Sequence, residues 1–334
     1  MPTFRWIGNN LPIIFTLFFL SACGGKTEEP KVDISPFLAN STEFLDVGQF
    51  QAAIIESRNA IQSAPDDLRG YISLANIYIE IGQPKEAINL LEPFDGSSAD
   101  FYLTQAKAYL RSGKLRSAGD TLAADVAVFA ARQIDYELLK AELEYARGRL
   151  DEAEKAFKVV LAGDRQNIDA AIGIARIDVA RRDFAAAEMK LEAVLIQAPA
   201  NPIALLFASS LQARKGNLTE AEDLLMEAVS ATPNTDIVTP VRFSVLTALR
   251  DNLTRQGKTS EAMIYSEILA ESSPGAREVN AQLQQAMEAL EQSDFEGAKL
   301  MLGDIQAKVP SSERAGTMLG VVEFLQGNNA EAVE

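Results

Sequence analysis

Few side chains in this sequence are of types that carry chemistry. The 334 residues contain no histidine and one cysteine, Cys23. This composition excludes His-based acid–base catalysis, Ser-His and Cys-His nucleophile pairs, and metal sites with histidine ligands. Carboxylates do cluster, as in Glu142-Leu143-Glu144 and Asp151-Glu152. Neighbouring helical residues point apart, so these clusters do not make the facing pair that carboxylate catalysis needs. We therefore predict that the chain is not an enzyme and holds no cofactor or metal.

Cys23 follows a short apolar segment. Arg5 is the only charge before residue 26, an apolar run covers residues 11–20, and Ser21 and Ala22 are small. A basic start, a hydrophobic centre and a small-residue exit are typical of a secretory signal peptide, which we place at residues 1–22. The run is shorter than the roughly 20 residues that a transmembrane helix needs.

The residues Leu20, Ser21, Ala22 and Cys23 resemble a bacterial lipobox, the motif that lipoprotein signal peptidase cleaves just before a diacylated cysteine. The resemblance implies that Cys23 begins the mature chain and carries acyl chains; the alternative is a free thiol. Residues 23–33 are polar and without periodicity, and we interpret them as the lipidated cysteine followed by a flexible tether.

Gly24 and the net charge bear on location. Lipoproteins retained at the inner membrane tend to carry aspartate where this chain has Gly24, so the resemblance implies an outer-membrane anchor that faces the periplasm. The net charge is −16, which disfavours nucleic acid and anionic lipid surfaces. Contact with the membrane is therefore expected through the acyl chains alone.

A periodic pattern covers the remainder of the chain. Alanines recur with six of eight gaps between 34 and 36 residues: Ala53, Ala87, Ala118, Ala153, Ala187, Ala221, Ala262, Ala298 and Ala332. The residue five positions before each is mostly glycine: Gly48, Gly82, Gly113, Gly148, Arg182, Gly216, Gly257, Ser293 and Gly327. Proline often stands twelve positions after the alanine: Pro65, Pro199, Pro233, Pro274 and Pro310.

This unit resembles the tetratricopeptide repeat, which is a pair of antiparallel helices, A and B. Gly82 suits the left-handed residue that ends helix A, and Pro84 suits the first turn of helix B. Ala87 is small, as a close helix crossing requires. The resemblance implies an all-α fold, a right-handed α-α superhelix over residues 34–334, with about eight full repeats and a truncated ninth. Helices A would line the inner side and helices B the outer side.

Two gaps depart from the period, and the ninth repeat is incomplete. The 31-residue gap around residues 95–98 predicts a shortened helix B in repeat 2. The 41-residue gap contains residues 234–240, which we interpret as a plain loop rather than a binding element. Thr239 and Pro240 suit the N-cap and first residue of the next helix. The sequence stops within helix B of the ninth repeat, so we expect a longer natural chain.

In the family, fixed positions of helix A line a concave groove that holds peptides or helices. The matching positions here are Asn76, Lys107, Arg111, Glu142, Tyr145 and Arg176. The amide and the cations suit a peptide backbone or a carboxylate, with Arg binding in a bidentate manner. Alternatively, these are solvated residues of a wet inner face. Ile72 stands where the chaperone-binding members have the first lysine of their clamp, so that activity is not expected.

These features favour a non-catalytic scaffold for protein partners at the outer membrane. The architecture is most similar to the repeat lipoproteins of exosortase (PEP-CTERM) and exopolysaccharide export systems. Type IV pilus and outer-membrane assembly lipoproteins have a similar build. An alternative of another class is the helical region of a periplasmic enzyme, such as a murein transglycosylase, with its catalytic domain beyond residue 334.

Overall fold

The computed structural model describes residues 32–96, 98–123, 126–232, 235–272, 276–308 and 313–326. The predictions for the signal peptide and for Leu20, Ser21, Ala22 and Cys23 lie outside these residues, as do most of the tether and the start of the ninth helix B. None of the helices that the structure describes is both long and apolar enough to cross a membrane.

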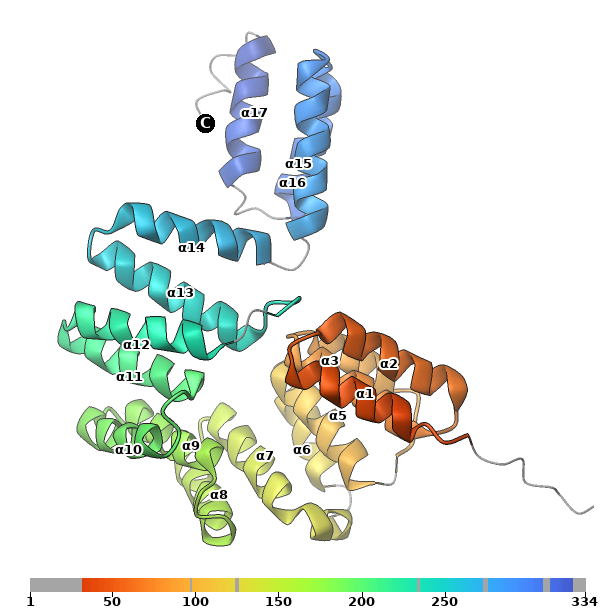
Figure 1. Cartoon of the computed structure of the whole chain (residues 1–334), viewed down its shortest axis with the longest axis vertical. Helices are drawn as coiled ribbons and strands as arrows, with labels where there is room; N and C mark the ends of the chain where they lie inside the picture. Colours follow the sequence, from red (N-terminus) through yellow and green to blue (C-terminus); the bar gives the residue numbers. More distant parts are fainter. Residues whose placement is uncertain are drawn as a thin grey trace, which may run out of the picture.

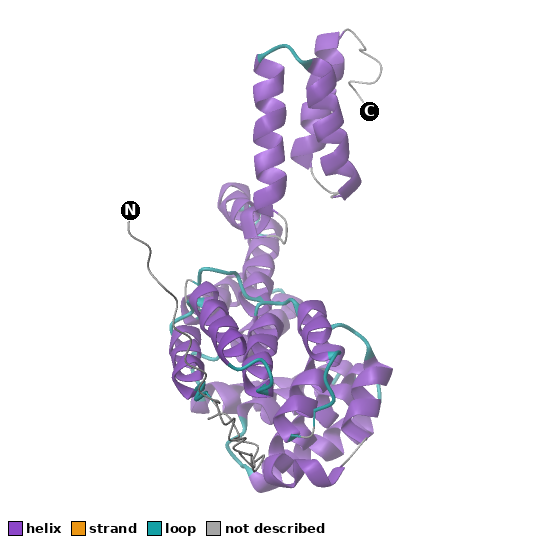
Figure 2. Cartoon of the chain, turned by 90° about the vertical axis from the view of Figure 1, so that its right-hand side faces the viewer, coloured by secondary structure: helices purple, strands orange, loops and turns teal. Residues whose placement is uncertain are grey.

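The described part of the chain is all-α, as predicted, and contains no strand (Figures 1 and 2). The first helices of the repeats are α1 (Ser35–Asp46), α3 (Leu68–Glu80), α5 (Ala99–Arg111), α7 (Gln133–Ala146), α9 (Ile168–Ala180), α11 (Pro202–Lys215), α13 (Pro240–Arg255), α15 (Ala276–Glu291) and α17 (Glu313–Gln326). Their partners are α2 (Phe50–Ser63), α4 (Pro84–Leu91), α6 (Leu115–Ala123), α8 (Leu150–Gly163), α10 (Phe184–Gln197), α12 (Leu218–Ala231), α14 (Thr259–Ser272) and α16 (Phe295–Lys308).

The turn between the two helices of a repeat needs a left-handed residue. Gly82 has φ +77°, its amide donates to Ile79 O, and the amide of Gln83 donates to Tyr78 O at 2.7 Å. This pattern ends α3 by satisfying its last carbonyl groups. The periodic alanines are buried, as predicted: the eight that the structure describes are between 0 and 5% exposed. Small side chains at these points let the paired helices cross closely.

Two second helices are short. Helix α4 has 8 residues, which confirms the shortened helix predicted for repeat 2. Helix α6 ends at Ala123, and a 3₁₀ helix, η1 (Val126–Arg132), follows it. The sequence did not predict η1. Its Phe129 is fully buried and stacks on Tyr136, with ring centroids 4.7 Å apart, so η1 fills the space left by the short helix.

The helix pairs stack into a curved solenoid (Figure 1). First helices of successive repeats contact each other, as in α1 with α3, α5 with α7 and α7 with α9. We therefore call the first helices the inner row. The pairs up to α13 curve round, whereas α15, α16 and α17 extend away from them towards the C-terminal end (Figures 1 and 2).

The residues inserted before α13 contact the first two repeats across the curve. The carboxylate of Asp236 accepts hydrogen bonds from the amides of Phe50 (2.9 Å) and Gln51 (2.8 Å). The side chain of Ile237 packs on the cluster that contains Phe50 and Ile77. Thr239 caps α13, as predicted, by accepting from the amide of Arg242. Our interpretation of the insertion as a plain loop was wrong, because it joins distant repeats.

Candidate functional site

The predicted groove residues lie on four successive inner helices, α3, α5, α7 and α9, and most contact one another. The hydroxyl of Thr104 lies 3.4 Å from Asn76 Oδ1, which joins α5 to α3. Arg111 Nη2 lies 3.2 Å from Glu142 Oε2, which joins α5 to α7. We call the following set the inner ladder: Asn76, Thr104, Lys107, Arg111, Glu142, Tyr145, Arg176 and Phe207.

The Arg111–Glu142 pair is open to solvent on one side. The Arg111 side chain is 51% exposed and that of Glu142 is 21% exposed. A pair of this kind contributes roughly 0–1 kcal/mol to stability, because water screens it. A carboxylate from a partner protein therefore has little to displace when it approaches Arg111.

Arg176 is held between aromatic rings of two neighbouring repeats. Its Cζ lies 4.4 Å from the centroid of the Tyr145 ring and 5.7 Å from that of the Phe207 ring on α11. Stacking of this kind fixes a guanidinium plane while leaving its N–H edge available. No ion pair joins Arg176 to any residue that the structure describes. This geometry is suited to receiving a carboxylate.

Our sequence reasoning missed Phe207, although a signal was present. Arg111 precedes Glu142 by 31 residues, Tyr145 precedes Arg176 by 31, and Arg176 precedes Phe207 by 31. A spacing of 31 is shorter than the 34-residue repeat by nearly one helical turn. Residues at this spacing lie where neighbouring inner helices meet. Counting 31 residues onward from Arg176 identifies the second ring.

Lys107 adds a further cation. It lies one helical turn before Arg111 on α5, is half-buried, and makes no ion pair within the described ranges. Residues four apart share a helix face. The ladder thus presents Lys107, Arg111 and Arg176 in a protein with a net charge of −16. The ladder itself has three cations and one carboxylate, Glu142, so its formal charge is positive.

The acidic clusters weighed as catalytic pairs form ion pairs. Glu144 binds Arg147 (2.8 Å) and Arg149 (3.1 Å), and Asp151 binds Arg181 (2.5 Å). The hydrogen bonds from Lys158 and then from Arg181 lower the pKa of Glu154 to about 2. Within the described residues, no group of three or more acidic or thiol side chains is arranged to hold a metal. These carboxylates connect helices.

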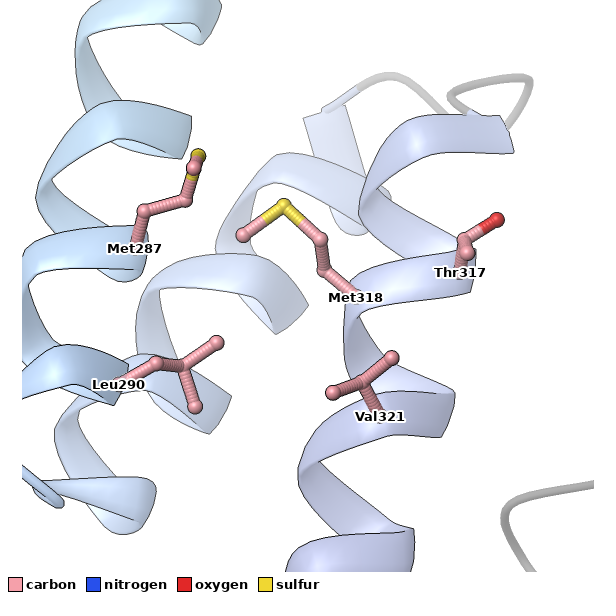
Figure 3. Close-up of a pocket in the computed structure, with 5 residues that line it drawn as sticks. All are labelled: Met287, Leu290, Thr317, Met318 and Val321. Atoms are coloured by element: carbon pink, nitrogen blue, oxygen red, sulfur yellow. The ribbon is translucent and has the colours of Figure 1, made fainter.

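The inner row becomes apolar towards its C-terminal end. The residue eleven positions before the repeat alanine is Asn76, Lys107, Glu142 and Arg176 in repeats 2 to 5, but Met287 in repeat 8 and Val321 in repeat 9. Met287 and Leu290 on α15 and Thr317, Met318 and Val321 on α17 line a groove of about 410 Å³ (Figure 3). The polar ladder is confined to the curved part of the solenoid.

Comparisons with known proteins agree with this architecture. Residues 172–235 and 283–334 match the family model described as tetratricopeptide repeat. The chain is similar in fold to the Cut9–Hcn1 hetero-tetramer of the APC/C (TM-score 0.54, 14% identity), covering 86% of this chain and 55% of that one. It is also similar to the human IFIT1 dimer with PPP-AAAA (TM-score 0.59, 14% identity), covering 90% and 71%. No curated protein matches the sequence.

The described part of the chain is an all-α solenoid of stacked helix pairs, and residues 172–235 and 283–334 of the chain match the tetratricopeptide repeat model. The chain spans about half the length of the chain that it matches in the Cut9–Hcn1 hetero-tetramer.

Proposed function

We propose that the protein is a non-catalytic scaffold whose inner ladder binds an extended, acidic segment of a partner protein. The observation that carries the proposal is Arg176, stacked between Tyr145 and Phe207 and without a carboxylate partner in the described chain. Lys107 and Arg111 lie two helices along the same inner row, where an extended segment that crosses several repeats meets them.

The chain's charge bears on the kind of partner. Cut9 is in a hetero-tetramer with another protein, and human IFIT1 is in complex with PPP-AAAA. The net charge of −16 opposes the approach of any polyanion, so the few cations of the ladder favour a short segment with a few carboxylates over the continuous negative charge of a phosphate backbone. A protein segment whose carboxylates meet the local cations of the ladder fits these charges better than a nucleic acid does.

We further propose that the scaffold is anchored by acyl chains on Cys23 to the periplasmic face of the outer membrane, where it serves export of the exosortase type or envelope assembly. The support is the lipobox-like sequence at residues 20–23 and the signal-like segment before it. Type IV pilus assembly and the helical region of a murein-cleaving enzyme are the alternatives. Acylated Cys23 in outer-membrane fractions, absent from a Cys23→Ser form, is the result this proposal requires.

Binding of synthetic peptides tests the ladder. We expect fluorescence anisotropy to show that labelled peptides rich in Asp and Glu bind more tightly than peptides of the same length rich in Lys. Arg176→Ala should weaken binding by about tenfold or more, since a charge-assisted hydrogen bond contributes roughly 1.5–3 kcal/mol. Arg176→Lys should recover little, because an ammonium has no flat, bidentate edge.

The control is Arg214→Ala. Arg214 also lies over an aromatic ring, that of Phe184, at 3.9 Å, but it is not one of the residues of the inner ladder. Peptide affinity should stay unchanged in this variant. Equal loss in the Arg176 and Arg214 variants, or equal binding of acidic and basic peptides, would contradict the proposal.

A further inference from the structure

We propose that residues 235–240 form a latch that closes the first seven repeats into a ring and controls entry to its inner side. The latch joins α12 to α13 and includes the first residue of α13. It contacts the turns of repeats 1 and 2 (Figure 1). Its role in holding the ring is independent of what the inner ladder binds. Its role in entry rests on the proposed function.

The latch caps the start of α2. The local N-cap residue, Gln49, makes no capping hydrogen bond with its side chain. Asp236 supplies the cap instead, from a position 186 residues away in the sequence, through both carboxylate oxygens. A carboxylate at a helix start satisfies free amides and lies at the positive end of the helix dipole. The amide of Asp236 also donates to Gly48 O at 3.3 Å.

The latch fits closely against two of the turn glycines. A Cβ atom placed on Gly48 would lie 2.7 Å from Thr235 Cγ2, and one placed on Gly82 would lie 2.8 Å from Pro240 Cγ. The equivalent turn glycines Gly113, Gly148, Gly216 and Gly257 have no atom within 4 Å of such a Cβ. The turns of repeats 1 and 2 are thus in close contact with the latch, while the glycine turns of repeats 3, 4, 6 and 7 are open.

The latch also buries apolar surface. Ile237 packs against a buried cluster made of Phe50, Ala53, Ile77 and Ile81. The latch therefore adds an apolar contact to the two capping hydrogen bonds, and it does so at the point where the solenoid returns to its own beginning. An open solenoid would expose this apolar side chain and leave the first amides of α2 to water.

Distance measurements between spin labels test the closed ring. The labels go on Ile55→Cys in α2 and Ser244→Cys in α13, two exposed positions, in the full chain with Cys23→Ser. We expect a single narrow distance distribution. Asp236→Ala should broaden it and move it to longer distance. Asp183→Ala, which removes a cap that serves only its own helix α10, should leave it unchanged.

A pair of glycine variants separates the latch from general destabilisation. Gly48→Ala and Gly148→Ala place the same methyl group at φ +73° and +76°, so the backbone cost is alike. Only the first methyl group meets the latch. We expect the longer distance in Gly48→Ala and the native distance in Gly148→Ala. Native distances in both Asp236→Ala and Gly48→Ala would overturn the proposal. So would distance changes in the controls Asp183→Ala and Gly148→Ala that equal those of the two latch variants.

Exchange and binding rates complete the test. Hydrogen exchange at the amides of Phe50 and Gln51 should be about tenfold faster in Asp236→Ala, as loss of a helix cap implies. If the latch controls entry, an acidic peptide should associate faster with Asp236→Ala than with the parent chain. An unchanged association rate in an opened ring would overturn control of entry. Absence of any peptide binding would contradict the proposed function and leave the ring intact.

Discussion

At the scale of single residues, the turn between paired helices shows how the backbone decides the residue type. Six of the turns that the structure describes have a glycine with φ between +73° and +90°. Repeats 5 and 8 carry Arg182 and Ser293 instead, at φ +65° and +62°. A side chain in the left-handed region costs roughly 1–2 kcal/mol, because its Cβ approaches the following carbonyl oxygen. Packing of the flanking helices must hold these two residues there.

Replacement of Arg182 by glycine should therefore stabilise the protein. We expect Arg182→Gly to raise the free energy of unfolding by about 1 kcal/mol, after the greater freedom of glycine in the unfolded chain is subtracted. The Arg182 side chain is exposed and makes no ion pair in the described structure, so little is lost. Urea unfolding monitored by circular dichroism measures the effect. Ser293→Gly should act in the same direction, and a lower midpoint in both variants would contradict this account.

Turn glycines, buried alanines and the Thr239 cap follow from the sequence because each depends on neighbours within one repeat. Phe207 and Asp236 were not identified for the opposite reason. The partner of Phe207 is one repeat away, and the partners of Asp236 are six repeats away. Their roles depend on how far the solenoid curves in each repeat. That angle is a sum of many small packing effects, which no single motif records.

At the scale of helices, ion pairs connect four second helices, α8, α10, α12 and α16, to the repeat that follows. The glutamate directly after the buried alanine binds a cation near the end of the next inner helix: Glu154 with Arg181, Glu188 with Lys215 and Glu222 with Lys258. In the last complete helix pair, α15 and α16, the charges are exchanged. Lys299 on α16 binds Glu323 on α17. The same contact with opposite signs indicates that the attraction between helices matters here, while the sign at either position does not.

The Glu154 pair should make stability depend on pH. Hydrogen bonds from Lys158 and Arg181 lower the pKa of Glu154 from 4.5 to about 2. The stabilisation is fully present above pH 4.5 and is lost as the pH falls towards 2. We expect Glu154→Gln to cost about 1 kcal/mol at pH 7, a value reduced for solvent screening because the cations are partly exposed. The difference from the parent chain should shrink as the pH falls through this window.

Urea midpoints at several pH values measure the difference. The matched control is Glu152→Gln, which alters an exposed glutamate on the same helix that has no ion pair in the described part of the chain. Its offset from the parent chain should not vary in the same window. A deficit of Glu154→Gln that stays constant between pH 7 and pH 3 would show that the ionised form of Glu154 contributes nothing.

At the scale of the whole molecule, the inner row has two parts of different character. The ring carries the polar ladder, while α15 and α17 carry the Met287 and Val321 groove. An acidic segment of a partner and an apolar segment of a partner would therefore bind at different places along this chain. The all-α solenoid was predicted from the repeat, since each helix pair buries its faces only against its neighbours. The closed ring was not, because it requires contact between units that are not neighbours.

The latch also changes how the molecule responds to force. A solenoid pulled from its two ends normally extends like a spring, with every repeat sharing the strain. Here the contact between Asp236 and α2 ties residues 186 positions apart, so tension cannot lengthen the ring until that contact breaks. The pair α15–α16 and helix α17 lie outside the tie. The ring therefore resists extension more than helices α15, α16 and α17 do. A force applied to these three helices reaches the ring through α13, the helix that follows the latch.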